Sequence, residues 1–292
     1  MVPTVRLFPF HQLPPGYGRT LDHPSHPPAT PRPAATLALL RDGRNGIETL
    51  LLKRSHRLGF IPGAYVFPGG GVDREDALPD LLSRLSGLSA HEDRARVGAD
   101  SGEPAADSEA SLPPRAFLAA ALRETFEETG VLLAASPGSY RTFPVGGTCR
   151  GGKARARLLR GLLTFHQVLQ ELDMDLDAGA LHLIGHWVTP EPEPRRYDTR
   201  FFAAEVPEGC PVEPHRQEVA EALWLTPAEA LERNRAGRLP LVYPTLKTLE
   251  DLEAFRETGQ ALEHLGRRDL PRLLPTVVKK PNGVEISVDE PT

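Results

Sequence analysis

Short apolar runs in the first quarter of the chain predict β-strands. Residues 35–40 and 47–52 form two such runs, and the Asp-Gly and Asn-Gly pairs between them are typical of a tight hairpin turn. A third run at 65–67 leads directly into a proline and three glycines at 68–71. Because glycine adopts backbone angles that other residues avoid, this segment predicts a loop of unusual shape.

Longer segments further along the chain carry the three-to-four-residue period of helices. Residues 115–133 and 158–172 are each predicted to be helical, and Gly130 stands near the end of the first as a stop signal. The remaining elements are shorter: a helix at 77–85, strands at 181–188, 200–206 and 222–225, a helix that opens at 226–229, and an amphipathic helix at 245–258. This mixed order predicts an α/β (α+β) fold with a helical C-terminal appendage.

Segments that lack the periodicity of helices or strands indicate where the domain boundaries lie. Residues 1–33 are predicted to be a Pro-rich N-terminal arm, 34–240 the main folded domain, and 241–292 the helical appendage and tail. Within the domain, residues 86–114 are rich in Ser, Ala, Asp, Glu and Gly, and poor in large apolar residues. Such a composition cannot bury enough apolar surface to pack well, so we predict a flexible insert.

Charge and cysteine content narrow the class of protein. The net charge of −5 argues against a surface that wraps nucleic acid or coats anionic lipid. Two cysteines, Cys149 and Cys210, are too few for a disulfide framework or a tetrahedral zinc site. Neither a signal peptide nor an apolar run of about 18 residues is visible. We therefore expect a cytoplasmic protein with neither nucleic-acid nor membrane partners, while a homodimer stays open.

Three glutamates carry the strongest chemical signal. Glu124 lies three residues before Glu127 and four before Glu128, so on a helix the three carboxylates share one face. An acidic face of this kind is often only solvated and partly neutralised, here by Arg123. The nearby glycine-rich loop instead favours a site where Mg²⁺ or Mn²⁺ meets substrate phosphates, because these cations prefer carboxylate oxygens.

The run Arg-Glu-Thr-Phe-Glu-Glu-Thr-Gly-Val at 123–131 resembles the second half of the Nudix box, Gly-x5-Glu-x7-Arg-Glu-U-x-Glu-Glu-x-Gly-U, in which U is aliphatic. Thr125 stands at the first aliphatic position. In the first half, Asp76 follows Gly70 at the spacing where the family has Glu, whereas Glu75 fits if the count starts at Gly69. The 46 residues at 77–122 then interrupt the box where the family has seven.

An interrupted box, together with segments outside it, resembles one branch of the Nudix hydrolases. This branch includes the peroxisomal coenzyme A diphosphatase of animals and its bacterial relatives, and the resemblance spans about residues 35–252. The supporting segments are 51–55, 60–70, 187–190, 195–202 and 244–246. The resemblance implies a Nudix α/β/α sandwich with a mixed sheet. Residues 289–292 are unlike a Ser-Lys-Leu address, so we do not carry over the peroxisomal location.

Roles for individual residues also follow from the resemblance. It implies Glu124, Glu127 and Glu128 as ligands of Mg²⁺ or Mn²⁺. Glu127, Glu128 and Arg123 are also expected in the catalytic set, where Arg123 pairs with a carboxylate of the box. A downstream carboxylate often assists in the family. Glu218 and Glu221 both stand in a suitable segment, and we favour Glu218.

Substrate binding is assigned to arginines and to the glycine loop. A guanidinium matches phosphate oxygens in a two-pronged geometry, which makes Arg54, Arg195 and Arg196 the candidates, with Gly69 and Gly70. The implied reaction is metal-dependent hydrolysis of coenzyme A or acyl-CoA, a small-molecule diphosphate, to 3′,5′-ADP and (acyl-)4′-phosphopantetheine. The alternatives are a Nudix diphosphatase for NADH, ADP-ribose or nucleoside polyphosphates, and a non-catalytic ligand-binding module.

Overall fold

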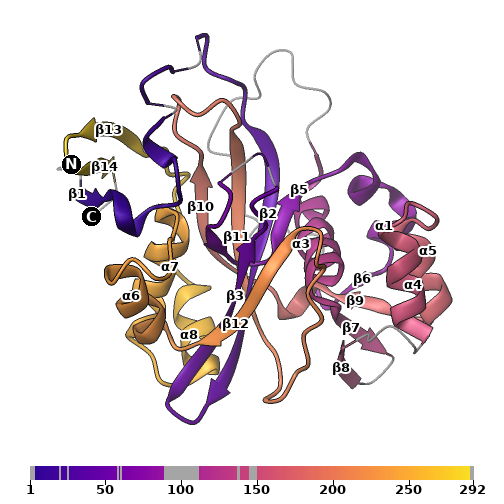
Figure 1. The fold of residues 1–292 in the computed structure, drawn as a ribbon. Helices are drawn as coiled ribbons and strands as arrows, with labels where there is room; N and C mark the ends of the chain where they lie inside the picture. The colour runs from indigo at the N-terminus through magenta and orange to yellow at the C-terminus, as the bar shows by residue number, and fades with distance from the viewer. Residues whose placement is uncertain are drawn as a thin grey trace.

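The computed structural model describes residues 4–289, except residues 20, 25, 58, 60, 89–111, 137–138 and 145–149. A seven-stranded mixed sheet lies at its centre (Figure 1). Its strands are β10 (His182–Val188), β11 (Tyr197–Glu205), β2 (Arg32–Gly43), β3 (Gly46–Arg54) and β12 (Val219–Leu225) in spatial order, with β4 (Tyr65–Val66) beside β3 and β5 (Gly69–Gly71) beside β2. β2 and β11 run parallel, and the other pairs are antiparallel.

One face of the sheet carries the helix predicted to hold the carboxylates. This helix, α3 (Pro114–Thr129), packs against β2 through a core that includes Leu37 and Leu39. Beyond it lie a four-stranded sheet and short helices: β6 (Leu85–Ser86), β9 (Asp175–Asp177), β7 (Val131–Ser136), β8 (Ser139–Pro144), η3 (Arg74–Ala77), α1 (Pro79–Leu82), α4 (Arg150–Leu158), α5 (Phe165–Leu172) and η4 (Ala178–Ala180). Strand β2 alternates its side chains between two buried faces.

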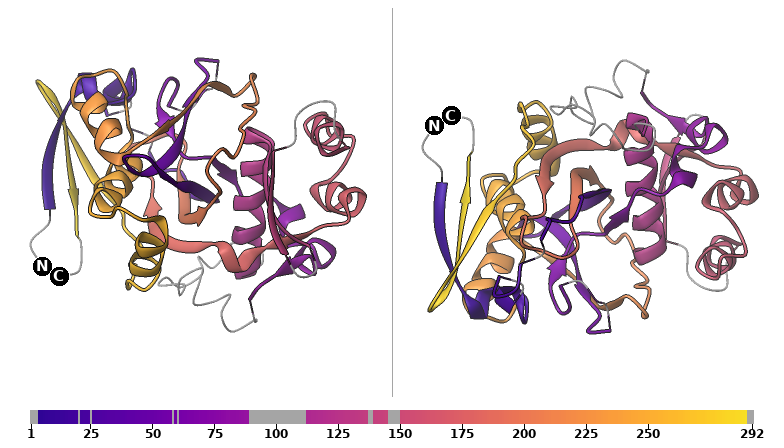
Figure 2. Two further views of the ribbon diagram at one scale, coloured as in Figure 1. Left: turned by 90° about the horizontal axis from the view of Figure 1, so that it is seen from below. Right: turned by 90° about the horizontal axis from the view of Figure 1, so that it is seen from above.

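The opposite face is covered by the C-terminal part of the chain. Ala38 and Leu40 of β2 belong to a second core shared with α6 (Pro227–Arg235), α7 (Tyr243–Glu253) and α8 (Thr258–Leu265). A three-stranded sheet of β1 (Thr4–Pro9), β14 (Gly283–Val288) and β13 (Thr276–Lys280) packs outside these helices, with η1 (Phe10–Gln12) and η2 (Tyr17–Arg19) following β1. Figure 2 shows β1 and β14 side by side. The predicted α/β/α sandwich is confirmed.

Both ends of the chain differ from their predicted form. Residues 1–33 were expected to be an arm, but β1 pairs with β14 across 4–9, and β2 already begins at Arg32. The C-terminal appendage is helical only to Leu265, and strands β13 and β14 follow. Strand β1 gains its hydrogen-bond partner from the other end of the chain, so local periodicity gave little sign of this pairing. Strands β13 and β14 pair as a local hairpin, and the Asn282-Gly283 pair at its turn is the sequence signal that was missed.

Three of the predicted helices are shorter than expected. Segment 115–133 stops at Thr129, because Gly130 takes a left-handed conformation with φ 75° and the chain continues as β7. Segment 158–172 is helical only as α5, which starts after a capping box at Thr164, whereas α4 ends at Leu158. Segment 245–258 is divided between α7 and α8. The short helix predicted at 77–85 is η3, α1 and β6 in succession.

Most of the predicted insert lies outside the described residues. Its two ends are nevertheless attached to the fold. Ser86 Oγ donates to the Leu176 carbonyl oxygen at 3.0 Å, and Leu88 and Leu112 pack against the core. In the described part of the chain, no helix is long and apolar enough to cross a membrane.

Candidate active site

The two halves of the interrupted box meet in one ion pair. Arg123 Nε and Nη2 donate to the two carboxylate oxygens of Asp76, each at 2.8 Å, and Asp76 is fully buried. Arg123 Nη2 also donates to the Gly71 carbonyl oxygen at 2.9 Å. The partner of Arg123 in the box is therefore Asp76 rather than Glu75. The long insertion does not separate the two halves in space.

The three glutamates of α3 are crowded and partly buried. Arg123 Nη1 donates to Glu124 Oε1 at 2.9 Å and to Glu127 Oε1 at 3.3 Å. Burial raises the pKa of Glu124 to about 7, against the lowering effect of Arg123. Burial and the charge of Glu124 raise the pKa of Glu128 to about 8, and burial also raises the pKa of Glu127. The cluster holds more negative charge than its surroundings neutralise.

The glycine loop approaches these carboxylates so closely that side chains are excluded. A Cβ on Gly70 would lie 2.5 Å from the carboxylate carbon of Glu124, and a Cβ on Gly69 would lie 2.5 Å from the Ala35 carbonyl oxygen. The Gly69 N–H donates to Glu128 Oε2 at 3.0 Å. Gly69 therefore helps to hold Glu128 in place, and glycine is required there because a Cβ would meet the backbone of β2, whereas a side chain at Gly70 would displace the carboxylate of Glu124.

A loop after β11 brings the downstream carboxylate to the same place. The His215 N–H donates to the Glu128 carbonyl oxygen at 2.8 Å, which ties this loop to the end of α3. The Ser55 N–H donates to the Glu218 carbonyl oxygen at 2.7 Å. Glu218 lines the cavity described next, whereas the carboxylate of Glu221 accepts a hydrogen bond from the Tyr65 hydroxyl at 2.5 Å. Of the two candidates, the structure brings Glu218 to the site.

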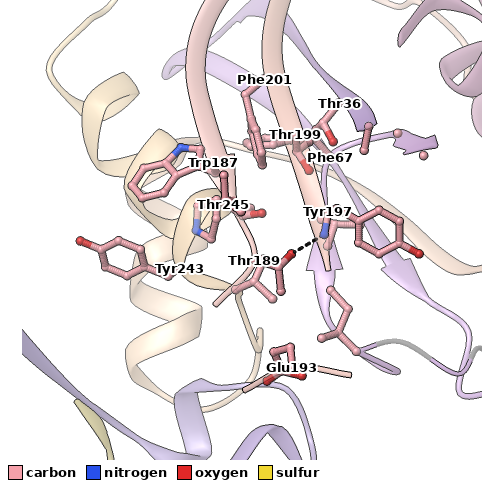
Figure 3. A pocket seen from close by; sticks show the side chains of 18 of the residues that line it. Thr36, Phe67, Trp187, Thr189, Glu193, Tyr197, Thr199, Phe201, Tyr243 and Thr245 are labelled. Carbon is pink, nitrogen blue, oxygen red and sulfur yellow. Dashed lines mark hydrogen bonds between the residues drawn. The ribbon is translucent and has the colours of Figure 1, made fainter. Parts of the chain in front are cut away.

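A cavity of about 390 Å³ extends from the carboxylates, within the usual size range of ligand sites. At one end it is lined by Arg54, Glu124, Glu128 and Glu218. Its other walls come from the glycine loop, β2, β10, β11, the start of α7 and the three-stranded sheet of β1, β14 and β13, here called the terminal sheet. Figure 3 shows side chains from the ends of β10 and β11 around this space, with Tyr243 and Thr245 from α7.

Comparison with known proteins assigns the family. The family model described as the NUDT19 Nudix domain matches residues 26–252. The chain belongs to this Nudix family. It is similar to the human acyl-coenzyme A diphosphatase NUDT19, with 34% identity over 287 residues, covering 86% of this chain and 71% of the relative. The protein of the same name from Xenopus laevis is 30% identical over 263 residues, covering 81% and 68%.

A solved structure supports the same assignment. The Nudix hydrolase from Alicyclobacillus acidocaldarius is 33% identical, with a TM-score of 0.63, and the match covers 80% of this chain and 96% of that one. The protein is accordingly a Nudix hydrolase, an enzyme that acts on diphosphate bonds, and the resemblance inferred from the interrupted box is confirmed.

The predicted arginines of this Nudix enzyme do not lie together. Arg54 lines the cavity beside the carboxylates. Arg195 is exposed, with its guanidinium beside Gly59, and it is not among the cavity-lining residues of the described chain. Arg196 is buried and donates to the carbonyl oxygens of Thr189 and Ala29, each at 2.9 Å. Its contacts are those of a structural residue, so we do not retain Arg196 as a phosphate ligand.

Two further features were not anticipated. Arg155 is buried and donates to the Glu127 carbonyl oxygen at 2.7 and 3.2 Å, which fixes the end of α3 against α4. The sequence shows Arg155 only as part of a basic run. The walls of the cavity opposite the carboxylates were missed as well, because Tyr17, Val277 and Ile286 come from segments whose packing depends on distant partners.

Proposed function

We propose that this Nudix hydrolase cleaves the diphosphate of coenzyme A or acyl-CoA to 3′,5′-ADP and (acyl-)4′-phosphopantetheine. One observation carries the proposal: Glu124 and Glu128, held by Arg123 and the Gly69 amide, open onto a cavity large enough for part of such a substrate. The names of the relatives, acyl-coenzyme A diphosphatase, support the choice of substrate.

The donor set fits Mg²⁺ or Mn²⁺ by its chemistry. Glu124, Glu127 and Glu128 offer only carboxylate oxygens, which hard divalent cations prefer. Burial raises their pKa values, and the charges of neighbouring carboxylates add to this effect. In the described residues, no three acidic, His or Cys side chains are yet gathered around one point as metal ligands. We propose that Glu124 and Glu127 turn away from Arg123 when they bind the cation.

The roles of the remaining residues follow from their positions. Bound Mg²⁺ or Mn²⁺ would neutralise charge on the diphosphate during attack by water. We assign Arg54, which lines the cavity beside the carboxylates, to bind a phosphate oxygen. We assign Glu218, which opens onto the same cavity, to accept the proton of the attacking water. Arg123 does not reach the cavity lining and acts by holding Asp76, Glu124 and Glu127 in register.

The direct test is a substrate panel. Purified protein is incubated with Mg²⁺ or Mn²⁺ and with coenzyme A, acetyl-CoA, dephospho-CoA, NADH and ADP-ribose, and the products are identified by mass. We expect 3′,5′-ADP and 4′-phosphopantetheine from coenzyme A. Faster turnover of NADH or ADP-ribose than of any CoA ester would replace this substrate, and no metal-dependent turnover of any compound would favour a non-catalytic ligand-binding module.

The same panel tests recognition of the 3′-phosphate. Arg54 and the exposed Arg195 are the remaining candidates to contact this group. Loss of one charge-assisted hydrogen bond worth about 1.5–3 kcal/mol should lower kcat/KM on dephospho-CoA about tenfold or more. Equal values on coenzyme A and dephospho-CoA would remove both arginines from this role. A cytoplasmic location and a homodimer stay predictions from the sequence.

A further inference from the structure

The cavity runs across four neighbouring strands of the central sheet. Strand β5, next to the carboxylates, pairs with β2 at Ala34 and Thr36. The other edge of the same stretch of β2 pairs with β11 at Thr199 and Phe201, and β11 in turn pairs with β10. Residues on all four strands line the cavity. Three strand spacings of about 4.8 Å give a floor roughly 14 Å long. The cavity is therefore a channel that leads away from the reacting end.

The charge along this channel is uneven. Arg54 is the one Lys or Arg among its described lining residues, and it stands at the carboxylate end. Away from that end, the lining includes Glu193, which is buried, and the hydroxyl-bearing Thr199 and Thr245. An anionic group placed there would meet a buried carboxylate and no cation. The far part of the channel is suited to a neutral ligand with hydrogen-bonding groups.

The far part of the channel is lined by the terminal sheet. Val277 of β13 and Ile286 of β14 are directly paired across the two strands, and both line the cavity. Tyr17, which follows β1 in the chain, adds to the same wall, and Trp187 and Tyr243 pack edge to face beside it with ring centroids 5.5 Å apart. Segments from the two ends of the chain thus form an apolar wall around whatever occupies the channel.

We infer that the pantetheine half of the substrate occupies this channel, while the 3′-phosphoadenosine half stays at the Arg54 end. The inference rests on the proposed function for the identity of the substrate. Pantetheine is an uncharged, extended arm whose amide and hydroxyl groups need a few polar partners in apolar surroundings. The channel provides these as Glu193, Thr199 and Thr245. The 3′-phosphoadenosine half carries a dianion, which needs cations instead.

Trp187 reports directly on the occupant of the channel. The chain has two tryptophans, and the other, Trp224, lies on β12 under the guanidinium of Arg41 and is not a cavity-lining residue. The variant Trp224→Phe therefore leaves one tryptophan, which lines the channel. Its emission is followed during titration with pantetheine, with 4′-phosphopantetheine and, separately, with adenosine 3′,5′-bisphosphate.

We expect saturable changes in Trp187 emission with pantetheine and 4′-phosphopantetheine, and none with adenosine 3′,5′-bisphosphate. Adding Val277→Phe should fill the channel and raise the Kd for 4′-phosphopantetheine at least about tenfold. The matched control is Val278→Phe, whose parent side chain is 44% exposed on the same strand, and it should leave the Kd unchanged. The titration of the Trp224→Phe protein does not depend on whether Val277→Phe folds.

The opposite pattern would overturn the inference. If adenosine 3′,5′-bisphosphate changes Trp187 emission and pantetheine does not, the nucleotide half occupies the channel. Equal weakening by Val277→Phe and Val278→Phe would also contradict a specific channel contact. The substrate panel is run on the same Trp224→Phe protein. Hydrolysis of coenzyme A with the reversed binding pattern rejects this inference alone, whereas pantetheine binding without hydrolysis rejects the proposed function alone.

Discussion

The two ends of the cavity differ in the side chains that line them: one end is charged and the other is apolar. At the carboxylate end, charged side chains are packed within hydrogen-bond distance, and burial raises the pKa values of Glu124 and Glu128 to about 7 and 8. At the far end, Trp187, Val277 and Ile286 make an apolar wall that shares in the second hydrophobic core. At the first end, burial and neighbouring carboxylates disfavour the charged forms of the glutamates. At the second end, burial of apolar side chains stabilises the fold.

This contrast indicates how substitutions should act. At the carboxylate end, the charged groups bond to specific partners, so removing one group takes away part of the compensation of another that stays buried. At the apolar end, side chains contribute mainly volume and shape, so changes there should alter binding more than chemistry. The largest effects are therefore expected at the carboxylate end.

The largest effect is expected when the ion pair that joins the two halves of the box is broken. In Asp76→Ala the buried guanidinium of Arg123 loses both of its 2.8 Å contacts with Asp76, so the free energy of unfolding should fall by about 3–5 kcal/mol. Chemical denaturation with coenzyme A hydrolysis measured in parallel checks this. The control is Glu75→Ala, the other residue that the box spacing allows. A greater loss in Glu75→Ala would reverse the assignment.

The second effect concerns catalysis rather than stability. Glu127→Gln and Glu128→Gln each keep the shape of the side chain and remove its charge, so kcat should fall at least about 100-fold at saturating metal, the scale of one strong transition-state contact. Glu221→Gln is the matched control, because Glu221 bonds to Tyr65 and does not line the cavity. Near-normal kcat in either test variant, with the fold intact, would show that the ligands are assigned wrongly.

The carboxylate end could be predicted from the sequence because its geometry is largely local. The i, i+3, i+4 spacing on one helix places Glu124, Glu127 and Glu128 together, whatever the rest of the fold does. The pairing of Asp76 with Arg123 was harder, since only the spacing from the glycine loop suggested it and two registers fitted. The two halves of the box could still be recognised despite the insertion between them, and in the folded protein Asp76 and Arg123 lie in contact.

The apolar end could not be predicted in the same way. The sequence shows Val277 and Ile286 only as apolar residues in a segment expected to be tail, and their place at the cavity depends on the packing of the β13–β14 hairpin against β1 and the second core. The prediction that Arg196 binds phosphate was wrong for a related reason. The sequence shows the charge of Arg196 but not the two carbonyl oxygens to which it donates. Long-range packing decided both cases, which is why the fold class was predictable while the walls of the cavity were not.

The third prediction uses pH to separate the two ends. Glu124 and Glu128 bind protons in the folded protein up to pH about 7 and about 8, whereas unfolded glutamates release theirs near pH 4.3. With divalent ions chelated, stability should therefore fall as pH rises from about 5 to 8 and level off above that. We expect Tm to drop by at least about 2–4 °C over this pH range, which corresponds to a loss of roughly 1 kcal/mol in the free energy of unfolding.

Added Mg²⁺ or Mn²⁺ should remove most of this fall, because the cation compensates the carboxylates in place of protons. The stabilisation by metal should thus be larger at pH 8.5 than at pH 5.5, as measured by thermal unfolding. Val277→Phe, a change at the apolar end, should leave the pH dependence intact. A Tm that stays constant from pH 5 to 8 without metal would contradict the surplus of charge inferred for the carboxylate cluster.

The smallest effect is expected outside both ends, in the insert. Replacing residues 89–111 by a short Gly/Ser linker should change the free energy of unfolding by no more than about 1 kcal/mol, because their composition is poor in large apolar residues and loop closure depends weakly on length. The anchored ends must stay, since Ser86 bonds to Leu176 and Arg115 donates to the Leu88 carbonyl oxygen at 2.9 Å. Replacing the longer segment 86–114 should therefore lower the free energy of unfolding by more than replacing 89–111. Equal costs for the two deletions in chemical denaturation would show that the anchors contribute nothing, and a large cost for the shorter one would show that composition misled us about the insert.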